Sequence, residues 1–361
     1  MDLEKRVDLV TRNVQEIVTH EELRELLKSE ARPRAYWGFE LSGLMHIGMG
    51  LVCGSKIKDM VEAGFDYTIF LADWHSWINN KLDGNMDNIR LCGEYFKDCF
   101  TALGIKPESV NYRWASDITR DVKYWERVIG IAKSASLQRT WRALPIMGRE
   151  TGLMDMETAW VFYPCMQSAD IFHMNLHVAC ASMDQRKAHM LARDAGEKLG
   201  WKKPVCVHTP LLVSLQGLQK TDKQFDENAE INVRIGSKMS KSVPEGCVFV
   251  HDSPEEIEAK LEAAFCPPRQ AEGNPVLEMA KLTVFPEKTS LTVTRPSKYG
   301  GPEIFNSYEE LERAYVKGDL HPLDLKKGVA DALTEILSPV REYFQRHPKN
   351  LEKMRKIEVS R

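Results

Sequence analysis

Asp66-Tyr67-Thr68-Ile69-Phe70-Leu71-Ala72 is a nearly continuous apolar run with the length of one β-strand. Such runs are typical of strands in a parallel sheet whose two faces are both covered by helices. Helical patterns flank the run, from Gly43 to Ala63 before it and from about Asp87 to Leu103 after it. Gly64 and Gly104 stand where these helices should end, because glycine readily adopts the left-handed conformation that closes a helix. The stretch therefore predicts a buried strand between two helices and an α/β fold.

The same alternation continues along the chain in both directions. Further strands are expected at Ala35–Phe39, Val110–Trp114, Leu176–Ala181 and Val205–Val213. Among them we expect a long helix over Val122–Arg142 and another that Gly200 ends. Strands that alternate with helices indicate a Rossmann-like, doubly wound parallel sheet, which binds its ligands at the carboxyl ends of the strands. His46, Asp73 and Asp184 follow predicted strand ends and are expected at that edge.

Composition and charge are those of an ordinary globular protein. The 361 residues are 43% hydrophobic and 28% charged, which leaves room for about two domains. The net charge of −3 does not suggest a uniformly basic surface, so any nucleic-acid-binding face must be local. The eight cysteines form no Cys-x-x-Cys pair, which predicts free thiols in a reducing compartment and no structural metal site. No apolar run reaches about 18 residues, so we expect a cytoplasmic protein without membrane spans.

Two short stretches, His46-Ile47-Gly48-Met49-Gly50 and Lys238-Met239-Ser240-Lys241-Ser242, carry the strongest functional signal. Each is weak alone, because a string rich in lysine and serine is most often a solvated loop and a lone histidine is most often a surface residue. Together they resemble the two signature motifs of class I aminoacyl-tRNA synthetases. Residues 46–50 are called the signature turn below, and residues 237–246 the signature loop.

The resemblance narrows to one family, the tyrosyl-tRNA synthetases of the archaeal and eukaryotic type, and extends over nearly the whole chain. The stretches that carry it are Tyr36-Trp37-Gly38-Phe39-Glu40, Ala72-Asp73-Trp74-His75, Tyr163-Pro164-Cys165-Met166-Gln167 and Met183-Asp184-Gln185-Arg186-Lys187. The resemblance implies that L-tyrosine is activated with ATP, accompanied by Mg²⁺, to tyrosyl-adenylate and pyrophosphate. The tyrosyl group would then pass to the 3′-terminal adenosine of tRNA(Tyr).

Amino-acid activation requires alignment of the reactants and neutralisation of charge on the leaving pyrophosphate. The resemblance implies His46, Lys238 and Lys241 for this work, because a helix start and two cations suit phosphate groups. The implied ATP-binding residues are Gly38, Glu40, His46, Gly48, Asp184, Lys238, Met239, Ser240 and Lys241. Asp184 would accept from the ribose hydroxyls, or alternatively cap the helix that follows it. Met49 stands where the family has a second histidine.

Tyr163, Gln167 and Asp170 are spaced by four and three residues, so one helix face would present three polar groups. A buried polar face is costly unless it binds something. The resemblance implies that Asp170 and Tyr36 hold the phenol hydroxyl of the substrate, although Tyr36 considered alone is a core residue. The residues implied to surround the substrate's α-amino group are Tyr163, Gln167 and Gln185. Those implied to form the walls of the pocket are Phe70, His75 and Met174.

Beyond the signature loop the composition shifts toward proline-rich connections and short helices. We expect residues 1–34 to form an N-terminal helical segment, residues 35–236 a catalytic domain and residues 247–361 a mostly α-helical, anticodon-binding domain. A connecting insertion near residues 125–165 is implied to lie at the interface of a homodimer. The polar segment 214–236 is predicted to be a loop.

The C-terminal domain is implied to read the anticodon with Tyr299, His321, Pro322 and Asp324. An aspartate can accept from the edge of a splayed guanine, and an aromatic side chain can stack on a base. As an alternative, Asp324 is a helix N-cap. Residues 341–361 carry a local excess of lysine and arginine, which predicts either a solvated tail or a phosphate-facing patch.

Three other functions share some of these features. Tryptophanyl-tRNA synthetases have the same fold and signatures, but Tyr36 together with Asp170 favours a phenol. Nucleotidyltransferases of the same superfamily are usually shorter and lack the helical domain. A synthetase-like binding protein without catalysis does not agree with the intact Lys238 and Lys241.

Overall fold

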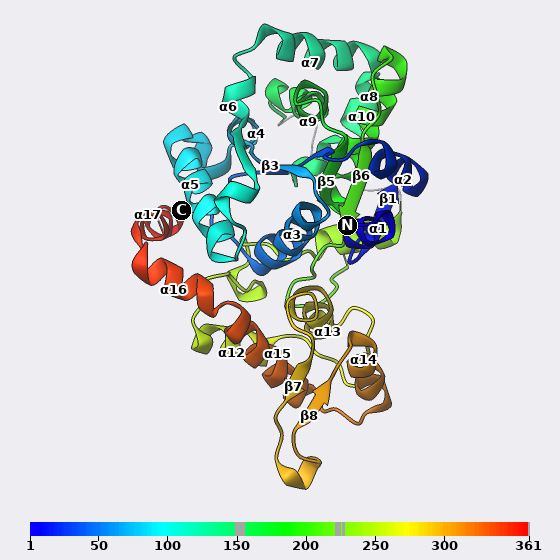
Figure 1. Ribbon diagram of the computed structural model, residues 1–361. Helices are drawn as coiled ribbons and strands as arrows, with labels where there is room; N and C mark the ends of the chain where they lie inside the picture. Colours follow the sequence, from blue (N-terminus) through cyan, green and yellow to red (C-terminus); the bar gives the residue numbers. More distant parts are fainter. Residues whose placement is uncertain (149–155, 221–224, 226–227, 360–361) are drawn as a thin grey trace.

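A computed structural model describes residues 1–148, 156–220, 225 and 228–359 of the chain. Its centre is a six-stranded sheet with the order β1-β6-β5-β2-β3-β4 (Figure 1). The strands are β1 Glu16–Val18, β2 Arg34–Phe39, β3 Asp66–Leu71, β4 Asn111–Trp114, β5 Val178–Ser182 and β6 Val205–Thr209. Strands β2 to β6 are parallel, and β1 runs antiparallel at one edge. The predicted α/β class and doubly wound sheet are confirmed, and the edge strand β1 is an addition that the sequence did not reveal.

The strand order reverses beside β2. The chain passes from β2 to β3 and β4 on one side and then returns to β5 and β6 on the other. In a doubly wound sheet, ligands bind in the crevice at such a reversal, outside the carboxyl ends of the strands. Phe39, Leu71 and Ser182 end the three strands that surround this point.

Helices cover both faces of the sheet (Figure 1). The helices of one face are η1 Gly48–Cys53, which is π-helical, α3 Gly54–Glu62 and α5 Met86–Ala102. Those of the other face are α7 Val122–Ser134, α9 Phe162–His173 and α10 Arg186–Leu199. Successive side chains of β2 point to opposite faces. Trp37 and Phe39 therefore belong to the first core, and Tyr36 belongs to the second.

The helix predicted over Gly43–Ala63 begins later than expected. Its first residues pair with a distant segment, because His46 and Phe249 form an isolated antiparallel bridge. Ile47 N–H also donates to the carbonyl of Val248 at 2.9 Å. These bonds use backbone groups that a helix would need, so the helical turns begin only with η1.

The single helix predicted over Val122–Arg142 is wrong. Two helices occupy this segment, α7 and then α8, Leu137–Trp141. Ser136 separates them, because its hydroxyl accepts from Arg139 N–H at 3.1 Å and so caps the second helix. No glycine or proline marks the break, which is why the apolar pattern did not show it.

Part of the predicted loop 214–236 is also helical. Helix α11 spans Ala229–Gly236, and Asn228 caps it by accepting from Glu230 N–H at 2.8 Å. Ile235 is buried in a small apolar cluster with Met183 and other residues, which gives the helix a packed side. Residues 221–224 and 226–227 of this loop, and 149–155 of the predicted connecting insertion, lie outside the described residues.

The C-terminal part is mostly helical, as the sequence predicted, and it also contains a strand hairpin that the sequence did not reveal. The helices are α12 Pro254–Ala263, α13 Pro275–Met279, α14 Tyr308–Lys317, α15 Pro322–Ile336, α16 Ser338–Arg346 and α17 Lys349–Val359, of which α13 and α17 were not predicted. The hairpin pairs β7, Leu291–Val293, with β8, Glu303–Phe305, and its tip projects from the molecule (Figure 1). Three-residue strands are too short to leave an alternating pattern.

Residues 349–359 are not a solvated tail, so that interpretation was wrong. They form α17, which packs on α5 of the catalytic part and buries Leu351 and Met354. Asn350 Nδ2 donates to Asp98 Oδ2 at 2.8 Å, and Tyr343 of α16 donates to the other oxygen of Asp98 at 3.1 Å. The basic residues of this segment therefore lie on a helix whose apolar side packs against α5.

The N-terminal segment contains α1 Leu3–Thr11 and α2 His20–Ser29 in addition to β1. A buried lysine of α3, Lys56, fastens α1 to the first layer of helices. Its ammonium group donates to the carbonyls of Leu9 at 3.0 Å and Arg12 at 2.6 Å, and it lies 2.9 Å from Asp59 Oδ2. The N-terminal helix is thereby tied to the helix that continues the signature turn.

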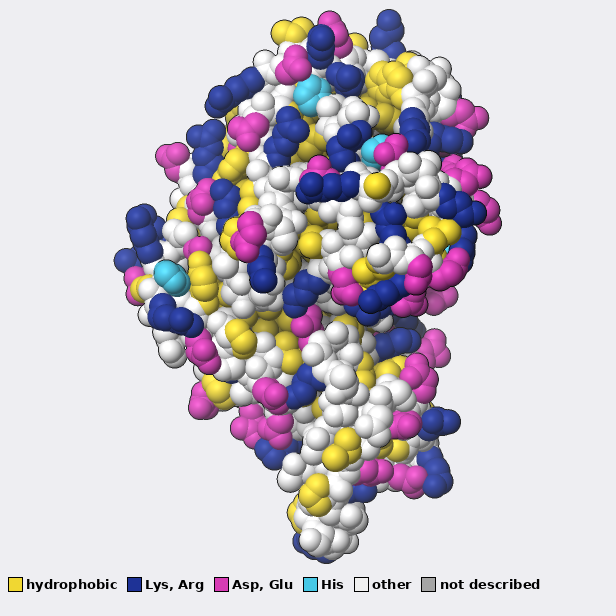
Figure 2. Space-filling view, in the orientation of Figure 1, with side chains coloured by type: hydrophobic (Ala, Val, Ile, Leu, Met, Phe, Trp, Pro, Cys, Tyr) yellow, Lys and Arg dark blue, Asp and Glu magenta, His cyan; other side chains and the backbone are white. Residues whose placement is uncertain are grey.

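Charges are mixed over the surface. On the face drawn in Figure 2, lysines and arginines are interspersed with aspartates and glutamates over both parts of the molecule. Among the described helices, none has the length and apolar character that a membrane crossing requires.

Candidate active site

A cavity of about 320 Å³ opens where the strand order reverses, and most of the predicted site residues line it. The predicted residues in its wall are Tyr36, Gly38, Glu40, His46, Gly48, Phe70, His75, Tyr163, Gln167, Asp170, Asp184, Gln185, Lys238, Met239, Ser240 and Lys241. They come from β2 and the residue after it, the signature turn, β3, α4 (Asp73–Ile78), α9, η6 (Met183–Gln185) and the signature loop.

Two residues expected near this edge do not line the cavity. Met174, predicted as a pocket wall, is buried in the same apolar core as Tyr36 and Phe70. Asp73 is fully buried, and its carboxylate accepts from the backbone N–H of Ser116 at 2.9 Å. Asp73 therefore holds the connection after β4 in place.

Asp170 forms one end of the cavity. It is only 1% exposed, and its Oδ1 accepts from the hydroxyl of Tyr124 at 2.9 Å. Its Oδ2 lies 3.1 Å from His75 Nε2. Tyr36 faces the same cavity and packs edge-on against Phe70, with ring centroids 6.2 Å apart. Tyr124 was missed by sequence reasoning, because it lies on a different helix and in none of the stretches that carry the resemblance.

The charge of Asp170 governs the protonation of its neighbours. Burial alone lowers the pKa of His75, but the carboxylates of Asp170, Asp73 and Glu40 outweigh it and the pKa is raised. Burial, together with the Asp170 charge, raises the pKa of both Tyr36 and Tyr124 well above the ordinary value. Both phenols therefore remain protonated and can donate a hydrogen bond.

The next part of the cavity carries amides. Gln167 Nε2 donates to Gln185 Oε1 at 3.3 Å, and Gln185 Nε2 donates to the carbonyl of Ile146 at 2.9 Å. The remaining oxygen, Gln167 Oε1, is buried, and no hydrogen-bond donor among the described residues reaches it. A buried acceptor without a partner is costly unless a ligand supplies the donor.

Glu40 lies between the amides and the basic end of the cavity. Its Oε1 accepts from Tyr163 at 3.3 Å and from Asn79 at 2.5 Å, and its Oε2 lies 3.4 Å from the ammonium of Lys81. Lys81 also lines the cavity, and sequence reasoning missed it. The signal for it was weak, namely a lysine six residues after His75, just beyond the short helix α4 that follows β3.

The signature turn begins the other end of the cavity. His46 Nδ1 accepts from Gly48 N–H at 3.1 Å, which leaves its Nε2 as the nitrogen that carries a proton. Burial, together with the charges of Lys241 and Lys238, lowers the pKa of His46 to about 3, so the ring is neutral near pH 7. A Cβ at Gly48 would lie 2.9 Å from His46 Cε1, so only glycine fits beside this ring.

Both lysines of the signature loop reach into the cavity. Lys238 Nζ lies 2.5 Å from Asp184 Oδ2, and Lys241 Nζ donates to Ser42 Oγ at 2.6 Å. Burial alone lowers the pKa of Lys238, but Asp184 outweighs it, so Lys238 stays charged. Asp184 does not cap α10, which begins at Arg186 without a side-chain cap. The alternative interpretation of Asp184 as a cap is therefore wrong.

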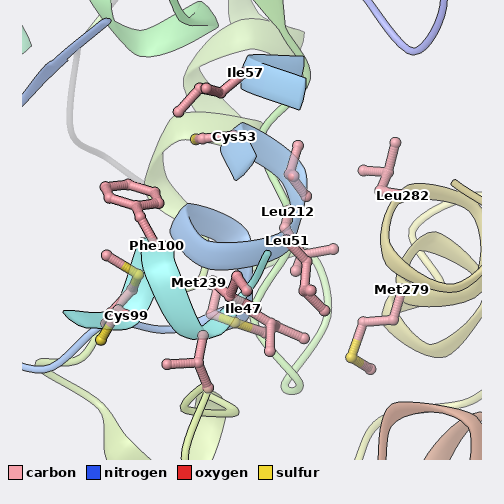
Figure 3. Packing of buried hydrophobic residues seen from close by; sticks show 14 of the residues in the cluster. Ile47, Leu51, Cys53, Ile57, Cys99, Phe100, Leu212, Met239, Met279 and Leu282 are labelled. Atoms are coloured by element: carbon pink, nitrogen blue, oxygen red, sulfur yellow. The ribbon is translucent and has the colours of Figure 1, made fainter. Parts of the chain in front are cut away.

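The signature loop is anchored at its start. Lys238 forms an isolated bridge with Val213, and Met239 N–H donates to the carbonyl of Leu212 at 2.7 Å. The side chain of Met239 is buried, and Figure 3 shows it beside Ile47 and Leu51. Met239, which was predicted to bind ATP, lines the cavity, and its buried side chain also fixes the loop to the signature turn.

The residues predicted to read the anticodon lie far from this cavity in the C-terminal part (Figure 1). His321 is the N-cap of α15, because its Nδ1 accepts from Leu323 N–H at 3.2 Å. Asp324 is in the first turn and half-buried, so the alternative interpretation of Asp324 as the N-cap is wrong. Pro322 begins the helix, and the backbone of Tyr299 lies at the tip of the β7–β8 hairpin.

Arg295 connects the hairpin to this turn. It donates to the carbonyl of Gly301 at 2.9 Å and to the carbonyl of Asp319 at 2.8 Å, and it lies 2.6 Å from Glu303 Oε2. The hairpin and the start of α15 are thus brought together, although 22 residues separate Tyr299 from His321.

Metal-binding groups are not apparent in the part of the chain that the structure describes. Those residues contain no group of three or more histidine, cysteine, aspartate or glutamate side chains that could hold an ion. All eight cysteines are free thiols, and seven of them are buried.

Comparisons with known proteins agree on one family. The profile described as tRNA synthetases class I (W and Y) matches residues 28–338. A tyrosine–tRNA ligase of Saccharolobus islandicus is 45% identical over 361 residues, covering 100% of this chain and 99% of the relative. The crystal structure of tyrosyl-tRNA synthetase complexed with L-tyrosine from Pyrococcus horikoshii matches with a TM-score of 0.91 and 44% identity, covering 99% and 100% of the two chains. A tryptophanyl-tRNA synthetase from Aeropyrum pernix, at 16% identity, a TM-score of 0.71 and coverage of 98% and 90%, shares the fold alone.

Proposed function

Since the chain belongs to the class I tRNA synthetases of the tryptophan and tyrosine type, we propose that it is a tyrosine–tRNA ligase. It joins L-tyrosine to ATP, releases pyrophosphate, and passes the tyrosyl group to the 3′-terminal adenosine of tRNA(Tyr). One observation carries the choice of amino acid, namely the buried Asp170 carboxylate that lines one end of the cavity beside Tyr36. A buried carboxylate requires donors, and a phenol hydroxyl is the donor that a tyrosine ring would bring there.

The proposed orientation of tyrosine follows from the two ends of the cavity. With the ring between Tyr36 and Phe70, the phenol hydroxyl meets Asp170 and the α-amino group lies near Gln167. The ammonium group would supply the donor that Gln167 Oε1 lacks among the described residues. Tyr163 and Gln185 complete the surroundings of the amino group, and the carboxylate then faces the signature turn and the signature loop.

ATP is proposed to occupy the end that contains the signature residues. The α-phosphate must stand in line with the tyrosine carboxylate, which attacks it and expels pyrophosphate. Neutral His46 donates from Nε2, and Gly38 and Gly48 allow the nucleotide to approach closely. Lys238 and Lys241 neutralise the charge that grows on pyrophosphate, while Mg²⁺ accompanies the nucleotide.

Transfer to tRNA is proposed to depend on the C-terminal part. Asp324, His321 and Pro322 lie at the start of α15, which Arg295 joins to the hairpin that carries Tyr299. Such an exposed turn can receive an unstacked base, with an aspartate as acceptor for its edge.

We also propose a homodimer in the cytoplasm. Three exposed large apolar side chains, Ile129, Leu137 and Phe162, belong to the predicted connecting insertion. Exposed apolar side chains of this kind suit a protein–protein interface. Free cysteines suit a reducing compartment, which is also where tRNA is charged.

The test is ATP–pyrophosphate exchange with each of the twenty amino acids in turn. Tyrosine alone should support rapid exchange, and the product should be transferred to tRNA(Tyr). Exchange that depends on tryptophan, or that no amino acid supports, would contradict the proposal.

A further inference from the structure

Tyr124 reaches the cavity only through Asp170. Its side chain is 0% exposed, and it is absent from the cavity wall, whereas Asp170 belongs to that wall. The Tyr124 hydroxyl donates to Asp170 Oδ1 at 2.9 Å. Tyr124 therefore touches no bound amino acid, but it determines how the carboxylate that does so is held.

Two side chains hold Asp170 from outside the cavity space that a substrate ring would fill. Tyr124 engages Oδ1, and His75 Nε2 lies 3.1 Å from Oδ2. A carboxylate has about four acceptor positions, so these partners leave others for a ligand. With Oδ1 held by the hydrogen bond from Tyr124 and Oδ2 beside His75, the carboxylate plane cannot turn freely.

Tyr124 is held in the role of donor. It has one hydroxyl hydrogen, and the only competing acceptor among the described residues is the carbonyl of Met166 at 3.4 Å, which is longer than the bond to Asp170. Burial and the charge of Asp170 raise the pKa of Tyr124, so the hydroxyl remains protonated. The phenol ring packs edge-on against Trp125 and His173, with centroids 5.5 Å away in both cases, which fixes its direction.

We propose that Tyr124 is a positioning residue that increases the preference for tyrosine over phenylalanine by fixing the Asp170 carboxylate. The proposal rests on the proposed function and extends it. A fixed carboxylate forms a stronger hydrogen bond with a substrate hydroxyl that points toward it. It also penalises phenylalanine, whose ring leaves the carboxylate short of a donor and without freedom to turn elsewhere. Without the Tyr124 hydroxyl, both effects become smaller.

Tyr124→Phe isolates this role, because it removes one oxygen from a fully buried ring and leaves the packing unchanged. In ATP–pyrophosphate exchange, KM for tyrosine should rise about tenfold, the effect of one hydrogen bond to a charged group, while kcat changes little. KM for phenylalanine should stay the same or fall. The ratio of kcat/KM for tyrosine to that for phenylalanine should therefore fall about tenfold or more.

Substrate analogues make the readout specific. p-Aminophenylalanine carries a donor at the ring end and should lose activity in the variant, as tyrosine does. p-Fluorophenylalanine has no donor and should behave as phenylalanine does.

A matched control comes from another buried tyrosine. Tyr315 is also 0% exposed and donates to the carbonyl of Pro267 at 2.9 Å, in the C-terminal part. Tyr315→Phe removes a comparable buried hydroxyl, and it should leave the ratio of tyrosine to phenylalanine unchanged. All variants are assayed well below the lowest of their melting temperatures, so that each is folded.

The outcomes separate the two proposals. An equal loss for both amino acids in Tyr124→Phe, or an unchanged ratio, would overturn the role of Tyr124 while the proposed ligase activity stood. A wild-type protein that does not exchange pyrophosphate with tyrosine would overturn the proposed function itself.

Discussion

Lys238 and Asp184 form an ion pair across the cavity, with 2.5 Å between Nζ and Oδ2. Lys238 is the cation proposed to neutralise pyrophosphate, and Asp184 is the carboxylate proposed to bind the ribose hydroxyls. Entry of ATP therefore has to give each of them a new partner. Asp184 exchanges an ammonium for hydroxyl donors, and Lys238 exchanges a carboxylate for phosphate oxygens.

Lys238→Ala should slow adenylate formation by about 10²-fold or more, because a charge that develops on the leaving group loses its cation. Tyrosine affinity should be nearly unchanged, since the tyrosine ring is proposed to lie at the other end of the cavity. Single-turnover kinetics and equilibrium binding of tyrosine measure the two effects. Lys202→Ala, an exposed lysine outside this cavity, serves as control. A large loss of tyrosine affinity would mean that the signature loop shapes the tyrosine pocket.

Asp170→Ala should raise KM for tyrosine and lower kcat/KM by about 2–4 kcal/mol, because a buried charged acceptor is removed. Exchange with phenylalanine should suffer far less. Steady-state exchange with both amino acids is the measurement. If both lose equally, Asp170 only maintains the fold through Tyr124 and His75.

Arg295→Met should weaken tRNA charging, because the hairpin loses its bonds to the turn that precedes α15. Asp324→Ala should do so as well, by about 1–3 kcal/mol in kcat/KM for tRNA, as expected for one lost base contact. Pyrophosphate exchange should not change in either variant. Arg313→Met provides the control, because this exposed arginine donates only within α14. Loss of exchange would show that these residues support the active site and not tRNA binding.

Combining Asp324→Ala with a tRNA whose first anticodon base is not guanine tests the contact itself. If both changes remove the same interaction, together they should cost little more than either does alone. Additive losses would show that Asp324 contacts something else.

Lys56→Met should destabilise the fold by about 3 kcal/mol. Loss of the buried ammonium leaves three carbonyls without this donor and removes one partner from Asp59. Lys58→Met is the matched control on the same helix. Lys58 pairs with Glu287 near the surface, so its loss should cost less than about 1 kcal/mol. Urea unfolding of both variants gives the comparison, and equal midpoints would contradict the role assigned to Lys56.

Acid should weaken the attachment of β1. The hydrogen bond from His208, with the charge and donors of Arg186, lowers the pKa of Glu16 to about 2. A lowered carboxyl pKa means that the stabilisation is complete above the unfolded value of about 4.5 and is lost as pH falls toward 2. Melting temperatures between pH 5 and 2 should therefore fall less steeply in Glu16→Gln than in the wild type. Parallel curves would show that Glu16 contributes nothing to this acid sensitivity.

Most of the sheet could be predicted, because its strands are apolar runs of strand length between helical patterns. β3 and β2 were found within one residue of their true ends. The elements that were missed owe their form to distant partners. β1 exists because it pairs with β6, and the late start of η1 depends on Phe249, some two hundred residues away.

The cavity could be predicted for a different reason. Its residues belong to short stretches with a recognisable resemblance, and the fold brings the ends of these stretches together. Tyr124 and Lys81 belong to no such stretch, so only the three-dimensional structure places them beside Asp170 and Glu40. Met174 shows the reverse case, because the resemblance implied that it is a pocket wall, whereas it follows the last residue of α9 and lies in the core.

Helix α17 lies against α5, so the C-terminal part is joined to the catalytic part at two places: where the chain crosses after the signature loop, and again where it returns. A part that is joined once can swing about its linker, whereas a part that is joined twice can only bend. The distance between the turn at His321 and the cavity is then fixed by the protein and does not adapt to a bound nucleic acid. A nucleic acid that contacts both the turn and the cavity must therefore have a matching length. One with a shortened arm would not reach both sites, whatever its bases are.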